Sequence, residues 1–449
     1  MPPRKYLASS VFALTALLLT IGCQGRSKRN QLPTVAGSGI YSRDVFDLAA
    51  QAEADALGTP EGYAAVAVKL RDQIRAVAPP GVKERSILCL SGGGSLGAYP
   101  AGVIYGWTQR GDRPTFDVVC GISTGALCSP FAFLGPKYDE QMKTFFTTLT
   151  NDDVYKKQIV RGLLGGEAFT DNAPLGKIVD NVITDEFITD LAVAHSQGRR
   201  LYVGTTTEEG RCSTIWDIGA IATRDGPCDR ALIRQILLGS SSIPGFFPPQ
   251  RITVSIDGKS YSEKHVDGGV SQSIFIRPPY VSPELREDPA ARSLTKTKVY
   301  AIVAGKLFSD PVASDNKALS MAGDSISTML YALTRGDLMR IYLASLIAGA
   351  DFNMSAIPTG FETYLSPVDF LPAETCKLFN EGVRVSKDGT AWRSAPPYAL
   401  AAEGEAAKVR DSRCLTFQQH GPVIPILGPK KQFVQPYGAS GIPNVPLIK

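Results

Sequence analysis

The hydrophobic and polar positions of this 449-residue chain alternate between short apolar runs and longer amphipathic stretches. Residues 86–91 (SILCLS) and 117–121 (DVVCG) are short apolar runs of the kind found in strands that are buried on both faces. Each run is followed by a helical pattern, the first over 97–109 and the second from Thr124 onward. Strand–helix–strand–helix within about fifty residues predicts a right-handed βαβ unit and therefore a parallel sheet.

The same patterns predict elements on both sides of this unit. Upstream, Ser42 is the expected N-cap of a helix over 43–56, and a second helix runs from Thr59 to about Val77. Downstream, we expect strands at 199–208, 212–218 and 298–304, helices at 229–239 and 320–348, and a hairpin over 251–266 that turns at Asp257-Gly258. The long helix has a weak point at Gly336, and its apolar stripe indicates core packing, with a membrane-binding face as the alternative.

Beyond residue 350 the periodicity fades, so irregular structure is expected there. The predicted fold class is therefore α/β. We expect a three-layer α/β/α arrangement with a mostly parallel central sheet, a helical N-terminal extension and an irregular C-terminal extension.

The N-terminus carries a targeting pattern. Arg4 and Lys5 precede an apolar run over 11–21, which is too short to span a bilayer and fits the apolar region of a signal peptide. The run ends in Thr20-Ile21-Gly22-Cys23, which resembles a bacterial lipoprotein signal, although Thr20 stands where Leu is usual. The alternative is a plain signal peptide with an incidental cysteine.

The lipoprotein resemblance implies that Cys23 is lipidated and anchors an exported protein to a membrane, with the polar residues 24–38 as a tether. Gln24 after the cysteine is similar to the residue found in lipoproteins that are forwarded to the outer membrane of a cell with two membranes. The expected location is the cell envelope, at the outer membrane, facing the periplasm or the cell surface.

Composition excludes several classes of protein. The net charge of +4 gives no electrostatic reason to expect a nucleic-acid partner. Three histidines and the absence of a Cys-x-x-Cys pair make a metal site unexpected, and no cofactor is expected. Oligomeric state is left open.

The cysteines that follow Cys23 fall into two groups. Cys89, Cys120 and Cys128 lie in apolar stretches and are expected to be buried thiols. In an oxidising compartment Cys212 with Cys228, and Cys376 with Cys414, are plausible disulfides, although spacing alone establishes neither bond.

The strongest chemical signal is Gly121-Ile122-Ser123-Thr124-Gly125, between a predicted strand and a predicted helix. This is the setting of a nucleophile elbow, in which Gly121 and Gly125 permit a sharp turn that raises Ser123 above the sheet edge. The alternative is that Ser123 is only the N-cap of a helix after a tight turn.

A second signal, Ser91-Gly92-Gly93-Gly94-Ser95-Leu96-Gly97, also joins a strand to a helix. The N–H groups of Gly92, Gly93 and Gly94 are expected to form an oxyanion hole, with Gly97 closing the loop. The spacing of Gly92, Gly94 and Gly97 also fits a dinucleotide fingerprint, but that motif needs an acid at the end of the second strand, and Asp117 lies at its start. A P-loop fails because no Gly-Lys-Ser/Thr follows.

Asp267-Gly268-Gly269 is the third signal, and it follows the segment 239–249 (GSSSIPGFFPP). The ordered set of motifs resembles the patatin-like phospholipases over residues 85–350. That resemblance implies a Ser123–Asp267 dyad, with Ser123 as nucleophile and Asp267 as general base, and Gly268 and Gly269 completing the motif. Leu96 departs from the Arg or Lys of many members, which puts a preference for anionic phospholipid in doubt.

The resemblance also implies the activity: a phospholipase A or lysophospholipase-like serine acyl hydrolase that acts on lipid acyl esters. An acyltransferase that uses the same acyl-enzyme, and a catalytically silent lipid-binding lipoprotein, are the alternatives. The expected domains are a signal peptide (1–22), a tether with N-terminal helices (23–84), the patatin-like hydrolase domain (85–350) and a C-terminal extension (351–449).

The three histidines have to be weighed as rivals to the dyad. Ser123, Asp267 and His420 follow the chain order of an α/β-hydrolase triad, but no catalytic motif surrounds His420. His265 is expected to be a structural histidine of its strand, with tuning of Asp267 as the alternative. His195 is expected to neutralise the C-terminus of a helix.

Overall fold

The computed structural model describes residues 41–43, 69–224, 226–308, 318–358, 360–363 and 365–396. The strands are β1 (Tyr41–Arg43), β2 (Arg85–Leu90), β3 (Val118–Ile122), β4 (Lys156–Lys157), β5 (Thr170–Asp171), β6 (Arg200–Thr207), β7 (Cys212–Asp217), β8 (Gln250–Ile256), β9 (Lys259–Asp267), β10 (Thr297–Ile302) and β11 (Asp351–Ser355). The helices, besides helical residues 69–76, are α4 (Ala98–Arg110), α5 (Thr124–Leu134), α6 (Asp139–Thr148), α7 (Asn151–Val154), α8 (Ile159–Leu163), α9 (Ala173–Val182), α10 (Asp185–Ser196), α11 (Ile218–Ala222), α12 (Pro227–Ser240), α13 (Pro289–Arg292), α14 (Ala318–Ile347) and α15 (Pro372–Lys387).

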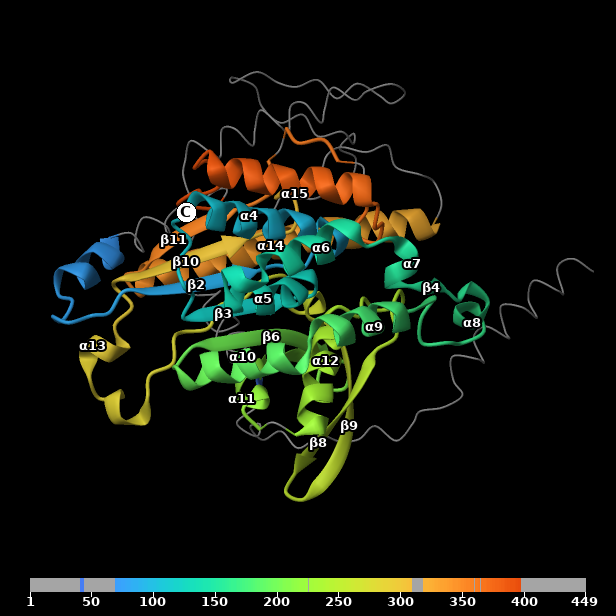
Figure 1. Cartoon of the computed structure of the whole chain (residues 1–449), viewed down its shortest axis with the longest axis horizontal. Helices are drawn as coiled ribbons and strands as arrows, with labels where there is room; N and C mark the ends of the chain where they lie inside the picture. Colours follow the sequence, from blue (N-terminus) through green and yellow to red (C-terminus); the bar gives the residue numbers. More distant parts are fainter. Residues whose placement is uncertain are drawn as a thin grey trace, which may run out of the picture. The chain divides into compact units, whose positions relative to one another are not determined.

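A mixed sheet forms the centre of this part of the chain, in the order β1-β7-β6-β3-β2-β10-β11 (Figure 1). Its middle, from β6 to β11, is parallel, whereas β7, β9 and β1 add antiparallel pairs on one side. The hairpin β8–β9 joins the sheet through β9, which pairs with the end of β6. Its turn has both Asp257 and Gly258 at positive φ, as a two-residue hairpin turn requires.

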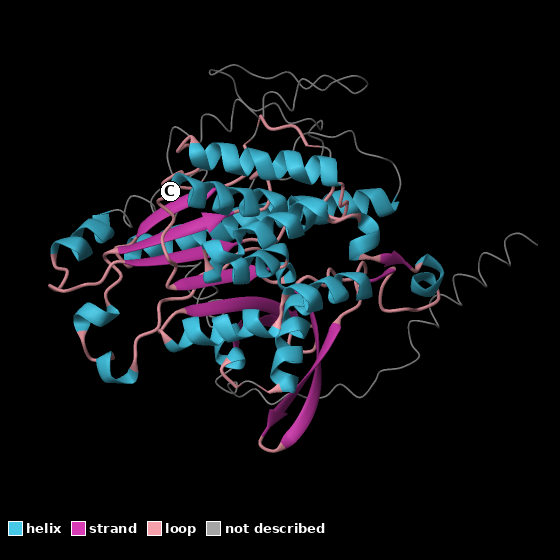
Figure 2. Cartoon of the chain, in the orientation of Figure 1, coloured by secondary structure: helices cyan, strands magenta, loops and turns pink. Residues whose placement is uncertain are grey.

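The two faces of the sheet bury separate cores because side chains alternate along each parallel strand. Leu88 and Leu90 of β2 pack under α4, α5 and their neighbours, whereas Ile87 and Cys89 face the core that α14 covers. Figure 2 shows the strands lying between helical layers. The expectation of a three-layer α/β/α fold with a mostly parallel sheet is confirmed.

Helix α15 runs alongside α4 at very close range (Figure 1). A methyl group added at Gly102 of α4 would overlap the backbone carbonyl of Phe379, and one added at Gly382 of α15 would overlap the backbone of α4 at Tyr99. Glycine at both positions therefore lets the two helix backbones approach each other.

Two predictions about the ends of the fold are wrong. Ser42 is a residue of β1, where it pairs with Ile215 of β7, because edge pairing with β7 outweighs the local capping signal. Residues beyond 350 are not irregular as expected: β11 pairs in parallel with β10, and α15 follows it. The sheet thus continues past the expected end of the hydrolase domain at residue 350, while residues 44–68 and 397–449 lie outside the described part.

Cys212 and Cys228, which were a plausible disulfide pair, are both free thiols. The six-residue strand β7 carries the chain roughly 17 Å away from Cys212 before α11 and α12 begin. Cys212 Sγ lies 3.7 Å from Thr207 Oγ1, whereas Cys228 is exposed in the first turn of α12. Cys376 is a free thiol, and its expected partner Cys414 lies outside the described residues. Cys89, Cys120 and Cys128 are buried thiols, as expected.

No helix within the described ranges is both long and apolar enough to cross a bilayer.

The close approach of α4 and α15 predicts opposite effects for two Gly→Ala substitutions. Gly102→Ala should lower the free energy of unfolding by about 1–3 kcal/mol, because the new methyl group must push α15 away. Gly336→Ala should raise it by up to about 1 kcal/mol, since Gly336 lies inside α14 with no atom near the added carbon. Urea unfolding of both variants measures the two effects, and a neutral Gly102→Ala would contradict the packing described here.

Candidate active site

Ser123 lies on the sharp turn between β3 and α5, with φ 55° and ψ −125°. Such a backbone conformation is strained for a residue other than glycine and persists only where its surroundings enforce it. The Ser123 N–H donates to Ser240 Oγ at 2.9 Å, and Ser240 Oγ donates to Gly204 O at 2.6 Å. The buried hydroxyl of Ser240 therefore holds the elbow to β6.

The glycines that flank the elbow leave room for this turn. A methyl group on Gly125 would overlap the carbonyl groups of Leu90 and Ser91 at the end of β2. Gly97, Gly121 and Gly268 likewise face neighbouring atoms too closely to carry a side chain. At Gly125 and Gly268 the elbow and the end of β9 thus lie directly against the backbones of β2 and β6.

Asp267 is the last residue of β9, and its side chain reaches Ser123 although the two residues are 144 positions apart in the chain. Its Oδ2 accepts the Ser123 hydroxyl at 2.6 Å, and its Oδ1 accepts the Gly269 N–H at 2.7 Å. The Asp267 N–H donates to Ser242 O at 2.8 Å, so the segment 240–242 fixes both Ser123 and Asp267. Burial raises the pKa of Asp267 to about 6, against the opposing effect of the hydrogen bonds from Ser123 and Gly269.

The glycine loop lies beside Ser123, but its three N–H groups are not equivalent. Gly92 N–H donates to Ser273 O at 3.1 Å and is therefore engaged. Within the described residues, Gly93 and Gly94 N–H donate to no protein acceptor, so these two N–H groups remain available to a bound ligand. Gly94 has φ +58°, and a side chain there would collide with Pro367 O.

Two partners that the sequence analysis did not identify hold this loop in place. Ser95 N–H donates to Pro367 O at 2.9 Å and Ser95 Oγ donates to Ser366 O at 3.0 Å. On the other side, the buried carboxylate of Asp337 in α14 accepts the Ser273 N–H at 2.7 Å. No sequence motif marks either partner, because both contacts join segments that are far apart in the chain.

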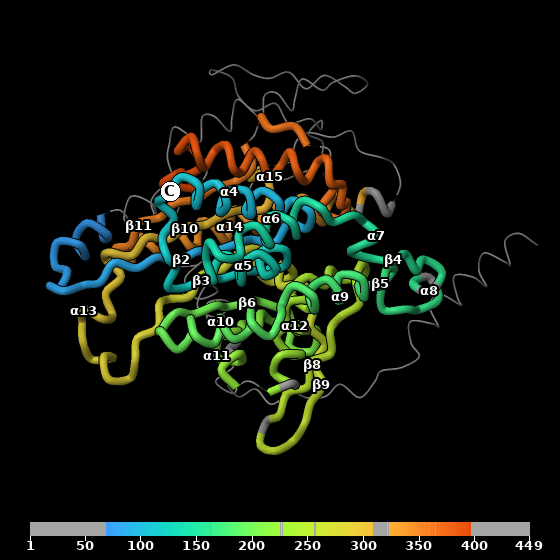
Figure 3. The backbone as a smooth tube through the Cα atoms, in the orientation of Figure 1, coloured from blue at the N-terminus to red at the C-terminus, as the bar shows by residue number. Residues whose placement is uncertain are grey.

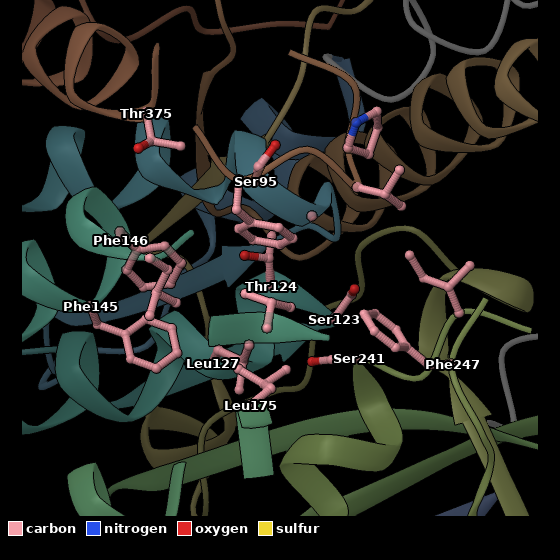
Figure 4. Close-up of a pocket in the computed structure, with 17 residues that line it drawn as sticks. Ser95, Ser123, Thr124, Leu127, Phe145, Phe146, Leu175, Ser241, Phe247 and Thr375 are labelled. Carbon is pink, nitrogen blue, oxygen red and sulfur yellow. The ribbon is translucent and has the colours of Figure 1, made fainter. Parts of the chain in front are cut away.

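A pocket opens beside Ser123 (Figure 4). Its lining contains no charged side chain. In the close-up, Phe145 and Phe146 lie on the opposite side of the pocket from Phe247, with Ser123 between them and nearer to Phe247. Val368 and Phe370 close a wall of this pocket, and the Phe370 N–H is anchored at 2.7 Å to Asn151 Oδ1. Ser241, Ile243 and Phe247 give the segment 239–249 a second role as pocket lining.

The remaining candidates from the sequence lie elsewhere. His265 is fully buried, with Nδ1 2.9 Å from Thr205 Oγ1 and Nε2 3.2 Å from Glu263 Oε2. His195 lies in the last turn of α10, as expected, with Nδ1 3.4 Å from Asp217 Oδ1.

Two other sequence positions have structural surroundings. Asp117 accepts the Ser86 N–H at 2.7 Å and so joins β2 to the start of β3, a structural role rather than a ribose contact. Leu96 is buried in the core. Cys23 and His420 lie outside the described residues.

A serine on a strained strand-to-helix turn, hydrogen-bonded to a buried carboxylate beside a glycine-rich loop, is the kind of arrangement that hydrolytic enzymes of α/β folds use. Residues 88–280 match the family model described as Patatin-like phospholipase. The chain therefore contains, over residues 88–280, a patatin-like phospholipase domain, which is the domain of a lipid acyl hydrolase.

Other comparisons add little to this assignment. No curated protein matches the chain. Among solved structures, the chain is similar to the crystal structure of VipD from Legionella pneumophila, with a TM-score of 0.33 and 13% identity over 69% of this chain and 67% of that one.

The raised pKa of Asp267 predicts an unusual stability effect. Burial raises the pKa of this carboxyl to about 6, well above the ordinary 3.8 of an aspartate. The free energy of unfolding should therefore fall by about 3 kcal/mol as the pH rises from the ordinary pKa to the raised one. Asp267→Asn removes that titration and keeps a similar shape. The variant should therefore be more stable than wild type at pH 8, by about 1–3 kcal/mol, and this advantage should vanish near pH 4.

Urea midpoints at the two pH values measure this difference. Glu263→Gln, which alters another buried carboxylate, serves as the comparison. An Asp267→Asn variant that is less stable than wild type at pH 8 would contradict the burial cost assigned to this carboxylate.

Proposed function

We propose that this protein is a serine acyl hydrolase of the phospholipase A or lysophospholipase type, which cleaves lipid acyl esters through a Ser123–Asp267 dyad. The observation that carries the proposal is the 2.6 Å hydrogen bond from Ser123 Oγ to Asp267 Oδ2 at the edge of an uncharged pocket. A direct serine–carboxylate contact of this kind requires no third residue to move the proton.

In the proposed reaction, Asp267 takes the hydroxyl proton as Ser123 Oγ attacks the ester carbonyl carbon. The N–H groups of Gly93 and Gly94 bind the oxyanion that forms on the carbonyl oxygen. Protonated Asp267 then gives its proton to the leaving alcohol, and the acyl group stays on Ser123. Water, deprotonated by Asp267, releases the fatty acid and restores the free serine.

The pKa of about 6 suits Asp267 to this role. A carboxyl of ordinary acidity is a weak base toward a serine hydroxyl, and desolvation raises its basicity toward the working pH. The carboxylate is still largely ionised at pH 7, so it is ready to accept a proton.

The geometry favours the dyad over a triad that includes His420. In a triad the histidine stands between serine and carboxylate, whereas here the Ser123 and Asp267 oxygen atoms touch. The histidines of the described residues, His195 and His265, are each engaged with other groups.

The uncharged pocket supports an acyl chain as the bound part of the substrate. Its walls are leucine, phenylalanine and other apolar side chains with a few hydroxyl groups, which offer nothing to an ionic ligand. We place the acyl chain there and the head group outside it.

We also propose that Cys23 is the lipidated first residue of an exported protein that is anchored at the outer membrane. The support is the sequence pattern alone: the apolar run that ends at Cys23, the polar residues after it, and Gln24.

The dyad predicts which substitutions abolish hydrolysis of a soluble short-chain ester. Ser123→Ala and Asp267→Asn should each lower kcat by at least about 10³-fold, since each removes a group that reacts directly. His420→Ala should stay within about 2-fold of wild type.

The wild-type kcat/KM should fall as pH drops below about 6, where Asp267 takes up a proton.

If the His420→Ala variant is folded but inactive, the dyad is rejected in favour of a triad that includes His420. Release of an acyl ester of an added alcohol in place of free fatty acid would identify an acyltransferase. A folded wild type that turns over no ester would leave lipid binding as the function.

The pocket predicts a separable effect on chain length. Leu127 lies one helical turn after Ser123 and lines the pocket, so Leu127→Trp should obstruct it. We expect kcat/KM for a twelve-carbon ester to fall at least about 10-fold while that for a four-carbon ester changes less than about 3-fold. Leu127→Ala, which enlarges the pocket, should keep twelve-carbon activity; equal losses on both esters would show that the acyl chain lies elsewhere.

A further inference from the structure

The excursion over residues 155–172 leaves the wall of the acyl pocket and returns to it. Val154, which precedes it, and Leu175, which follows it, both line the pocket. Between them the chain forms the short β4–β5 ladder and α8, which lies at the outer right edge of the described chain in Figures 1 and 3. Helix α8 is therefore close, along the chain, to two residues that line the pocket.

The outer side of this excursion is apolar and exposed. Ile159, Val160 and Leu164 have exposed fractions of 57%, 72% and 82%. Phe169 lies beneath α8 and is itself partly exposed. Large apolar side chains gathered within one short segment are costly in water and indicate a surface that is covered in use.

The base of the excursion is firmly attached, so the exposed side chains are held out from the body. Gln158 N–H donates to Phe169 O at 2.7 Å, and Phe169 N–H donates to Gly245 O at 2.9 Å. The Tyr155 ring packs against the rings of Phe246 and Phe247 at centroid distances of 5.0 and 6.2 Å. Phe247 is itself a pocket residue, so the base of the excursion and the acyl pocket share a wall.

Both signs of charge occur beside the apolar side chains, and Asp171, opposite Lys156 in the β4–β5 ladder, accepts the Ala173 N–H at 3.0 Å. Lys156 and Lys157 are exposed, and no described acidic side chain forms an ion pair with either. The nearby Glu167 is neutralised by Arg251 at 2.5 Å and Lys264 at 3.0 Å. Apolar side chains flanked by unpaired lysines match the interface of an anionic lipid bilayer, where the chains enter the acyl region and the lysines meet the head groups.

We propose that α8 and its flanking residues form a bilayer-docking surface, in which Ile159, Val160 and Leu164 insert into the lipid and Lys156 and Lys157 bind anionic head groups. This surface places the mouth of the acyl pocket against the membrane, so that a lipid passes from bilayer to Ser123 without crossing water. The inference rests on the proposed lipid hydrolase function for its meaning, but docking itself does not require catalysis.

The test uses the full chain with Cys23→Ser in every variant, so that no acyl group on Cys23 contributes to binding. Cosedimentation with phosphatidylcholine vesicles, with or without phosphatidylglycerol, is measured in a Ser123→Ala background. The combined change Ile159→Asp, Val160→Asp and Leu164→Asp should weaken binding to the mixed vesicles at least 10-fold. The matched control, Val193→Asp with Leu285→Asp, alters exposed apolar residues elsewhere and should bind as the parent does.

Lys156→Glu with Lys157→Glu should abolish the preference for vesicles that contain phosphatidylglycerol and leave binding to neutral vesicles unchanged. The parent's preference should weaken at high salt, as expected for attraction between exposed charges. Equal salt dependence in parent and variant would contradict the role of the lysines.

Activity with intact Ser123 separates this proposal from the proposed function. The α8 triple variant should hydrolyse a soluble short-chain ester within 2-fold of the parent and lose at least 10-fold on vesicle lipid. Unchanged vesicle binding in a folded triple variant overturns the docking surface. If the triple variant instead loses binding to another protein, the surface is a protein interface. Vesicle binding that depends on α8 in a chain without esterase activity would uphold the surface and reject the hydrolase.

Discussion

The contact between Ser123 and Asp267 is the constraint around which the described fold is arranged. It joins a turn after β3 to the end of β9, which are 144 residues apart, and it places a carboxylate where burial penalises its charge. Because burial disfavours the charged carboxylate of Asp267, a rigid surrounding structure is needed to hold it beside Ser123. This surrounding frame is the meeting of β2, β3, β6 and β9 at one edge of the sheet, where glycines let the backbones touch.

Three consecutive serines show how tightly this frame is determined. Ser240 fixes the elbow through its hydroxyl, Ser241 lines the pocket, and Ser242 accepts the Asp267 N–H through its carbonyl. One turn of chain at the end of α12 thus contacts Ser123, the pocket and Asp267 together. Substitution in this segment should therefore affect all three, which gives a physical reason for a polar run in an otherwise buried place.

The sequence was sufficient for those parts of the molecule whose determinants are local. The buried parallel strands, the hairpin at Asp257-Gly258 and the elbow could be predicted because period, turn chemistry and glycine spacing lie within a few residues. The family resemblance then paired Ser123 with Asp267, which no local pattern shows.

Nonlocal determinants account for the rest. β1 pairs with β7, and Ser42 gave the opposite signal; β11 is short, and only its partner β10 makes it a strand. The engagement of Gly92 N–H by Ser273, and of Ser95 by Pro367, depends on segments that carry no motif. The plausible pairing of Cys212 with Cys228 is not found, because the position of Cys228 depends on where strand β7 leads the chain, which no local pattern shows.

The contact of Pro367 with the glycine loop has a consequence for the order in which the protein is made. The loop that would bind the oxyanion is synthesised early, but its wall, formed by residues 366–370 and secured through α15, follows some 270 residues later. A chain that is still emerging, or that ends before this wall, holds both Ser123 and Asp267 and yet has an open pocket and an unsupported loop. Completion of the site is thereby tied to completion of the domain.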